Sequence, residues 1–199
     1  SISTMNLTKI FIILLLFNFN YTHATSMDPV IFIKSTVNIS SQILSTNISK
    51  DKKITELKSI AKETVDILGV GYYSLGTIRK NLTDEQKAKY SDLFESYFLK
   101  SFSSRLSDYT NPKLEVQDKE VINKNYTIVN SILVATSERP EVKIDWRVYT
   151  NNPNSPLIRD LIIEGLSLAR TQKEEFASIL NSNDKDIKAL FTALEECSK

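Results

Sequence analysis

Few side chains in this sequence have the types and spacing that catalysis requires. His23 is the only histidine and Cys197 the only cysteine among the 199 residues. His23 lies in an N-terminal segment that we expect to be removed, and the rest of the chain then has no imidazole for a Ser-His-Asp or Cys-His arrangement. It also has no imidazole to bind zinc or iron, so we expect no metal, no cofactor and no enzymatic activity.

Three other features have chemical interpretations that the sequence does not favour. The adjacent carboxylates of Glu174-Glu175 and Glu195-Glu196 fall on predicted helices, where neighbouring side chains point in different directions, so we interpret them as solvated surface. Residues 69–71 (GVG) lack the third glycine and the Gly-Lys-Ser/Thr of nucleotide-binding loops, and they predict a helix-terminating turn. Cys197 is either an unpaired thiol or an intermolecular bridge.

The N-terminal residues have the pattern of a secretory signal peptide. Lys9 precedes an unbroken apolar run at residues 10–17 (IFIILLLF), and the small residues Thr22 and Ala24 follow it. The run is about half the ~20 residues that a membrane-spanning helix needs. We therefore expect residues 1–24 to be cleaved as a signal peptide and residues 25–199 to form a single domain. The alternative is an uncleaved N-terminal anchor.

The charge of the chain gives no bias toward a polyanion. The sequence has 25 basic and 24 acidic residues, and removal of residues 1–24 takes away one lysine and no acid. A mature chain with 24 residues of each sign has no overall attraction to nucleic acid, so we expect no nucleic-acid partner.

Apolar periodicity and capping residues predict helices at both ends of the mature chain. Asp28-Pro29 is an N-cap followed by proline at the first helical position, and a second helix begins near Ile54. Residues 83–86 (TDEQ) form a capping box that starts the longest helix, with a stripe of large aromatic residues. Two further helices follow Gly165.

Between these helices the period of the apolar pattern changes to two. Alternating β-branched and aromatic residues predict strands near residues 114–116, 126–135, 142–149 and 157–164. Short turns between them imply an antiparallel sheet. Strands grouped apart from helices predict an α+β fold.

Several stretches resemble the MlaC family, also called the toluene-tolerance family. They keep the family's order over nearly the whole mature chain: 28–33 (DPVIFI), 68–73 (LGVGYY), 82–86 (LTDEQ), 93–98 (LFESYF), 105–109 (RLSDY), 143–147 (KIDWR), 163–168 (IEGLSL) and 176–180 (FASIL). One position departs from the pattern. Arg159 precedes Asp160 where the family usually has an aromatic residue, which implies a more polar channel edge in this chain.

The resemblance implies an NTF2-like cone in which a curved, four-stranded, mostly antiparallel sheet is wrapped by about five helices around an apolar cavity. It implies a periplasmic phospholipid carrier, an auxiliary component of an ABC transporter, that helps to maintain the lipid asymmetry of the outer membrane. It also implies three partners: a phospholipid ligand, an inner-membrane lipid-transporter complex and an outer-membrane lipoprotein/porin complex.

From the resemblance and the period-2 pattern we propose residues that line the cavity. They are apolar, and within each strand they share one face: Ile128, Ile132, Val134, Ile144, Trp146, Val148 and Ile163. The alternative on strands two and three is the opposite set of faces, with Val129, Leu133 and Tyr149. A second alternative is a solid core, in which these strand residues meet Phe94, Phe98 and Phe102 and leave no space.

Two other functions remain open at this point. An NTF2-like envelope enzyme would need a buried titrating carboxylate, because the histidine that such enzymes usually use is missing. A non-carrier adaptor protein would carry no lipid when purified.

Overall fold

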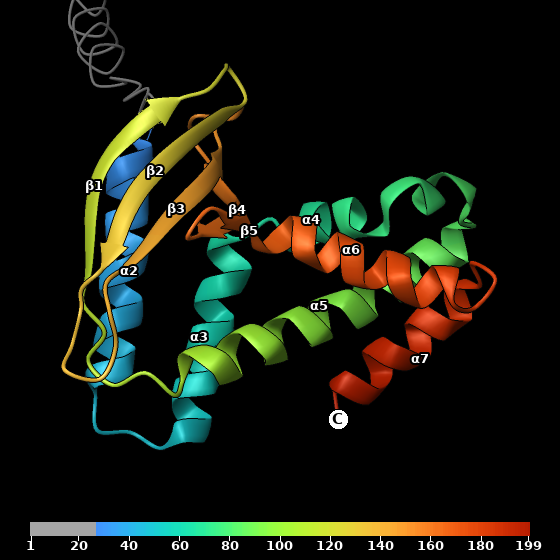
Figure 1. Cartoon of the computed structure of the whole chain (residues 1–199), viewed down its shortest axis with the longest axis horizontal. Helices are drawn as coiled ribbons and strands as arrows, with labels where there is room; N and C mark the ends of the chain where they lie inside the picture. Colours follow the sequence, from blue (N-terminus) through green and yellow to red (C-terminus); the bar gives the residue numbers. More distant parts are fainter. Residues whose placement is uncertain (1–26) are drawn as a thin grey trace, which may run out of the picture.

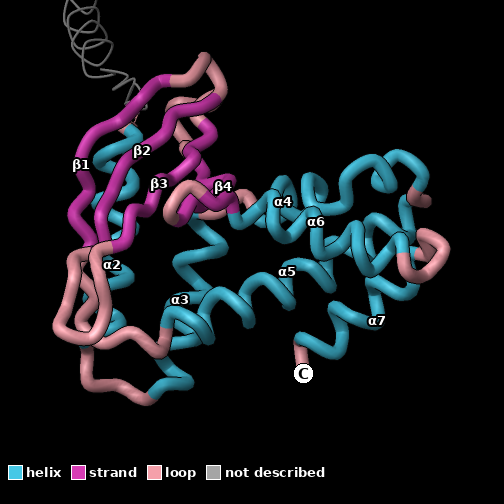
Figure 2. Tube along the Cα trace, viewed as in Figure 1, coloured by secondary structure: helices cyan, strands magenta, loops and turns pink. Residues whose placement is uncertain are grey.

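The structure, a computed structural model, describes residues 27–199; the predicted signal peptide lies outside the described residues. Within residues 27–199 the chain forms six α-helices, one 3-10 helix and five strands (Figures 1 and 2). In chain order these are α2 (Pro29–Ser45), α3 (Lys50–Thr64), α4 (Ile67–Leu75), η1 (Gly76–Asn81), α5 (Asp84–Leu106), β1 (Leu114–Val121), β2 (Tyr126–Leu133), β3 (Val142–Tyr149), β4 (Leu157–Ile163), β5 (Leu166–Ser167), α6 (Leu168–Asn181) and α7 (Ile187–Cys197).

The sheet is antiparallel throughout, with the strands in the order β1-β2-β3-β4-β5. This confirms the predicted α+β class and antiparallel sheet, but there are five strands in the described chain where four were expected. Glu164 and Gly165 both have positive φ and form a two-residue turn, after which Leu166 pairs back onto Ile163. The chain therefore makes a hairpin before it enters α6.

One face of the sheet, here called the inner face, packs against α2. On β2 the buried residues alternate with half-buried ones, and the buried set is Thr127, Val129, Ser131 and Leu133. Val129 and Val148 contact Phe32 and Ile33 of α2 in a single apolar cluster. The other face is called the outer face below. Figure 1 shows α2 running behind the strands.

The predicted starts of α2 and α5 are confirmed. The Asp28 carboxylate accepts a hydrogen bond from the Val30 N–H, and Pro29 is the first helical residue. At α5, the Thr83 hydroxyl accepts from the Gln86 N–H while the Gln86 side chain accepts from the Thr83 N–H, so both halves of the capping box form.

The prediction that Gly69–Gly71 ends the second helix is wrong. The helix α3 begins at Lys50 and ends at Thr64, because Val65 is extended and forms a parallel bridge with Ile158 of β4. The Asp66 side chain then accepts from the Gly69 N–H and starts α4, which contains both glycines. A tertiary contact to the sheet thus divides one predicted helix into two.

Residues 27–199 pack around two apolar cores. One is shared by α3, α4, α5, α6 and α7 and contains Tyr90, Phe94 and Leu190; the other lies between α2 and the sheet. Val65 packs against both cores. The sheet with α2 and the helical half therefore meet at the α3–α4 junction, and Figures 1 and 2 show α4–α7 extending away from the sheet.

Candidate functional site

The structure divides the seven predicted cavity residues between the two faces of the sheet. Residues directly opposite each other in an antiparallel pair share a face. Ile128 pairs with Arg147, and Ile132 pairs with Lys143, so both isoleucines lie on the outer face. Ile144, Trp146, Val148 and Ile163 lie on the inner face, and Val134 follows the end of β2. The seven residues therefore do not form one surface.

Val148 lies in solid core. Its exposed fraction is 0%, and it packs with Phe32, Ile33 and Ile158. The alternative in which the strand residues meet Phe94, Phe98 and Phe102 is not what the structure has, because those rings belong to the helical core. Helix α2, and not α5, packs against β1 and β2, while α4 and α6 contact β4.

Beyond α2, the inner face presents apolar side chains that are only partly covered. Helix α2 contacts mainly β1 and β2, and the inner-face side chains of β3 and β4 beyond Val148 and Ile158 are only half-buried. Side chains paired across the strands there form a continuous patch, called the inner-face patch: Ile144, Trp146, Leu161, Ile163 and Leu166. Leu166 is 59% exposed.

The indole of Trp146 is held in place by a hydrogen bond to the neighbouring strand β2. Its Nε1–H donates to the Ser131 hydroxyl at 2.8 Å, and that hydroxyl donates to the Ile144 carbonyl at 2.6 Å. Ser131 is only 1% exposed, so its hydroxyl is shielded from bulk water. The hydrogen bond satisfies the polar edge of the indole and leaves its apolar ring available to the patch.

A β-bulge in β4 is the feature that period-2 reasoning missed. Arg147 pairs with Asp160 and Val148 pairs with Ile158, which leaves Arg159 as an extra residue without a partner on β3. Because of this extra residue, Ile158, Leu161 and Ile163 all lie on the inner face. Leu161 was not among the predicted residues, although alternation from the predicted Ile163 places it on the same face; the residue that alternation cannot place there is Ile158.

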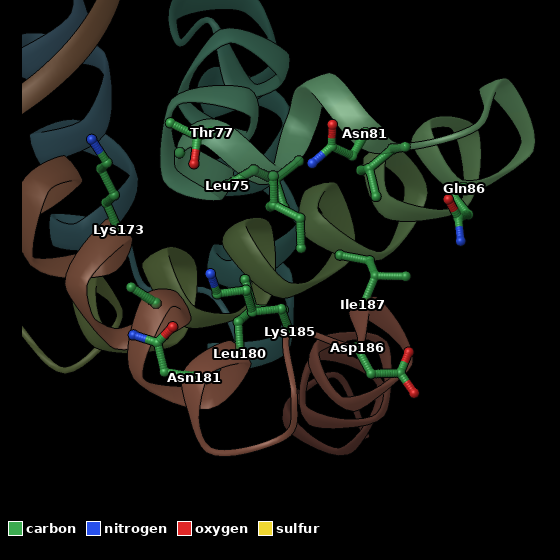
Figure 3. Close-up of a pocket in the computed structure, with 14 residues that line it drawn as sticks. Leu75, Thr77, Asn81, Gln86, Lys173, Leu180, Asn181, Lys185, Asp186 and Ile187 are labelled. Atoms are coloured by element: carbon green, nitrogen blue, oxygen red, sulfur yellow. The ribbon is translucent and has the colours of Figure 1, made fainter.

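A separate pocket of about 580 Å³ lies at the end of the helical half that is remote from the sheet. Figure 3 shows it between η1, the start of α5, α6 and the turn that leads to α7. Its apolar lining consists of Leu75, Ile78, Leu82, Ala177, Leu180 and Ile187. None of the seven predicted residues lines this end pocket.

The polar lining of the end pocket includes two lysines and one acid. Lys173 lies 5.1 Å from the centre of the Tyr73 ring, and the Asp186 carboxylate accepts from the Lys188 N–H at the start of α7. Asn181 of α6 and Lys185 of the turn before α7 also line the pocket. An apolar floor with a partly cationic rim suits one end of an amphipathic molecule.

Two phenols of the helical core, Tyr90 and Tyr97, have pKa values raised by their surroundings. Burial raises the pKa of the Tyr90 phenol, whose hydroxyl donates to the Gly71 carbonyl at 2.6 Å. Burial, followed by the nearby Glu175 carboxylate, raises the pKa of Tyr97. Both phenols therefore stay protonated at neutral pH and act as structural donors. Within residues 27–199 no group of His, Cys, Asp and Glu is placed to hold a metal ion.

None of the helices between Met27 and Lys199 is both long enough and apolar enough to cross a membrane. The described residues present three candidate binding surfaces: the inner-face patch, the end pocket and, on the outer face, a cluster of Arg147, Arg159, Tyr126 and Tyr149.

Comparisons with known proteins find one matching family and a similar solved structure. A family model described as MlaC protein matches residues 34–196. A solved structure of a phospholipid-binding protein from Ralstonia solanacearum, in complex with a phospholipid, is similar with a TM-score of 0.72 and 19% sequence identity, covering 86% of this chain and 97% of that chain. A search of curated proteins finds no match.

Proposed function

Because the chain belongs to the MlaC family, we propose that it binds a phospholipid and carries it between membranes. The observation that carries this proposal is the shared fold with a protein that was solved with a phospholipid bound. Binding without chemistry also agrees with the absence of imidazole from residues 25–199.

The inner-face patch is our proposed wall for the acyl chains. Its side chains are apolar, belong to three neighbouring strands and are left partly uncovered by α2. Each methylene group that leaves water is worth about 0.8 kcal/mol, so even partial coverage of a long chain by this patch contributes several kcal/mol. Trp146 is the largest residue of the patch, and Ser131 fixes its position.

We place the action of the protein in the periplasm, after cleavage of residues 1–24. In this scheme it exchanges lipid with an inner-membrane transporter complex and with an outer-membrane lipoprotein/porin complex. Edman sequencing of the exported protein tests the first step and should begin Thr25-Ser26-Met27. A product that keeps residues 10–17 and stays in the membrane contradicts it.

Native mass spectrometry of the purified mature protein tests lipid binding directly. We expect a bound phospholipid, identified after extraction by its acyl-chain masses. A protein that is free of lipid after mild purification, and that takes up none from vesicles, would be an adaptor and not a carrier.

Three variants locate the acyl chains. Leu161→Asp places a charge in the inner-face patch, and we expect it to abolish lipid co-purification in a folded protein. Ile132→Asp on the outer face is its matched control and should keep the lipid. Ala177→Trp fills the end pocket. If this third variant loses lipid while Leu161→Asp keeps it, the acyl chains occupy the end pocket and the inner-face patch is wrong.

A further inference from the structure

Two arginines and two tyrosines form a compact cluster on the outer face, at the end of the sheet next to the α3–α4 junction. The rings of Tyr126 and Tyr149 lie 5.5 Å apart. The Arg147 guanidinium lies 4.0 Å from the centre of the Tyr126 ring, and the Arg159 guanidinium lies 3.7 Å from that of Tyr149. All four side chains are half-buried, so the cluster is ordered by its own contacts and still reachable from solvent.

The β-bulge brings the second guanidinium to this cluster. Arg159 is the extra residue of β4, and its side chain lies over the Tyr149 ring while Asp160, the next residue, pairs with Arg147 on the same face. Bulges often redirect a side chain toward a functional site. The family resemblance places an aromatic residue at this position, so the paired guanidinium groups depend on a residue in which this chain departs from the family pattern.

The carboxylates near the cluster are already engaged. Asp66 accepts from the Arg159 Nε–H at 2.8 Å and from the Gly69 N–H at 3.0 Å. Asp160 accepts from the Ser167 hydroxyl and from the Ala169 N–H, at the start of α6. Arg159 also donates to the Tyr126 hydroxyl at 2.7 Å. These contacts fix Arg159 and use both acids without involving Arg147.

Arg147 is the exception within the cluster. In the part of the chain that the structure describes, the Arg147 guanidinium makes neither a hydrogen bond nor an ion pair. It stacks on the aromatic ring of Tyr126. A guanidinium has five N–H donors in a planar fork that matches two oxygens of a phosphate group. Stacking on Tyr126 restricts the orientation of the Arg147 guanidinium before a ligand binds, which lowers the entropy cost of ordering this side chain on binding.

We propose that Arg147, with Arg159 and the Tyr126 hydroxyl beside it, forms a binding site for a phosphate oxyanion on the outer face of the sheet. The source of the phosphate is either a phospholipid headgroup at a membrane surface or free phosphate. The site lies on the face opposite the inner-face patch, and it does not depend on acyl-chain binding by that patch.

Titration of the mature protein with inorganic phosphate, followed by amide chemical shifts in two-dimensional NMR, tests the site. We expect saturable shifts confined to residues around Tyr126, Arg147 and Arg159. Arg147→Ala should weaken phosphate binding by about 10- to 100-fold, the effect of losing hydrogen bonds to a charged group. Arg147→Lys keeps the charge but not the fork, and it should also bind more weakly than the wild type.

Arg170→Ala is the matched control, because Arg170 is an exposed arginine of α6 that pairs with Glu174 and lies outside the cluster. It should bind phosphate as the wild type does, and unchanged melting temperatures show that each variant is folded. Vesicles of phosphatidylglycerol in phosphatidylcholine form the second arm. Binding to vesicles that requires Arg147, without binding of free phosphate, supports the site and assigns its phosphate to a headgroup.

Two results overturn the proposal. In the first, neither phosphate nor vesicles perturb the cluster. In the second, they bind equally well to the wild type and to Arg147→Ala. Neither result bears on whether phospholipid co-purifies through the inner-face patch, so failure of this site and failure of the proposed function are distinguishable.

Discussion

Gly71 of α4 lies against the ring of Phe94 in α5, so closely that a Cβ atom on Gly71 would stand 2.7 Å from the Phe94 Cδ1 atom. The same glycine offers its carbonyl to the Tyr90 hydroxyl at 2.6 Å. Both contacts require the backbone of α4 to approach α5 without an intervening side chain. The glycine that resembled part of a nucleotide loop is therefore a packing residue of the helical core.

Gly71→Val should destabilise the fold by roughly 1–3 kcal/mol, because the added methyl groups force Phe94 out of its packed position. Chemical denaturation, monitored by circular dichroism, measures the change. Leu68→Ala on the exposed side of the same helix is the control and should shift stability by no more than about 0.5 kcal/mol. Equal stability of Gly71→Val and wild type would mean that the two helices do not pack this closely.

Gly165→Val should also destabilise, by roughly 1–3 kcal/mol, but for a different reason. No atom lies within 4 Å of a Cβ placed at Gly165, so there is no clash, and the cost comes from its φ of +79°. Asparagine tolerates this backbone region, so Gly165→Asn should lose clearly less. Thermal denaturation of the three proteins checks the order, and equal losses for the two variants would contradict a backbone origin.

The ion pair between Asp28 and Lys119 should make stability depend on pH in the acid range. The hydrogen bond from the Lys119 ammonium, at 2.6 Å, holds the pKa of Asp28 below its ordinary value of 3.8. A lowered pKa stabilises the fold above the unfolded-state value, and this stabilisation is lost as the pH falls through the lower folded-state value. Because both side chains are partly exposed, the effect should be about 1 kcal/mol or less.

Asp28→Asn isolates that charge, since asparagine is an equally good N-cap. The wild type should be the more stable protein at pH 6. The difference should begin to shrink below about pH 4, where the unfolded aspartate binds its proton, and vanish below the lower folded-state pKa. Urea titrations at several pH values measure the difference. A constant gap across the acid range would show that the ion pair contributes nothing.

Ser131→Ala should release the indole of Trp146, which is the only tryptophan in the chain. Without the hydroxyl, the Nε1–H turns to water, so we expect a red shift of the fluorescence emission and a loss of roughly 1–3 kcal/mol. Ser59→Ala, an exposed serine of α3, should leave the emission unchanged. An unshifted spectrum in Ser131→Ala would mean that the hydroxyl does not hold the ring.

Val148→Asp and Ile132→Asp should behave oppositely, although both replace an apolar strand residue. Val148 is fully enclosed by α2, so a charge there has no partner and should cost about 3–5 kcal/mol or more and unfold the domain. Ile132 is half-buried on the outer face, where water reaches the new carboxylate, and its variant should stay folded. Circular dichroism and elution volume separate the two outcomes.

Local signals in the sequence were sufficient for the class of fold and for several boundaries. Asp28-Pro29 and the Thr83 capping box act within one helical turn, so the folded protein starts α2 and α5 where the sequence predicts. Alternation likewise showed which residues of one strand share a face. The missing imidazole excluded histidine chemistry from the chain beyond residue 24, whatever its fold.

What the sequence could not supply was the relation between elements. Period 2 does not set the phase of one strand against the next, so only the pairing of Ile128 with Arg147 revealed that the predicted residues of β2 and β3 lie on opposite faces. The bridge from Val65 to Ile158 ended α3 early, and the bulge at Arg159 placed Ile158 on the same face as Leu161 and Ile163. Each depends on hydrogen bonds between distant segments, which only the assembled sheet provides.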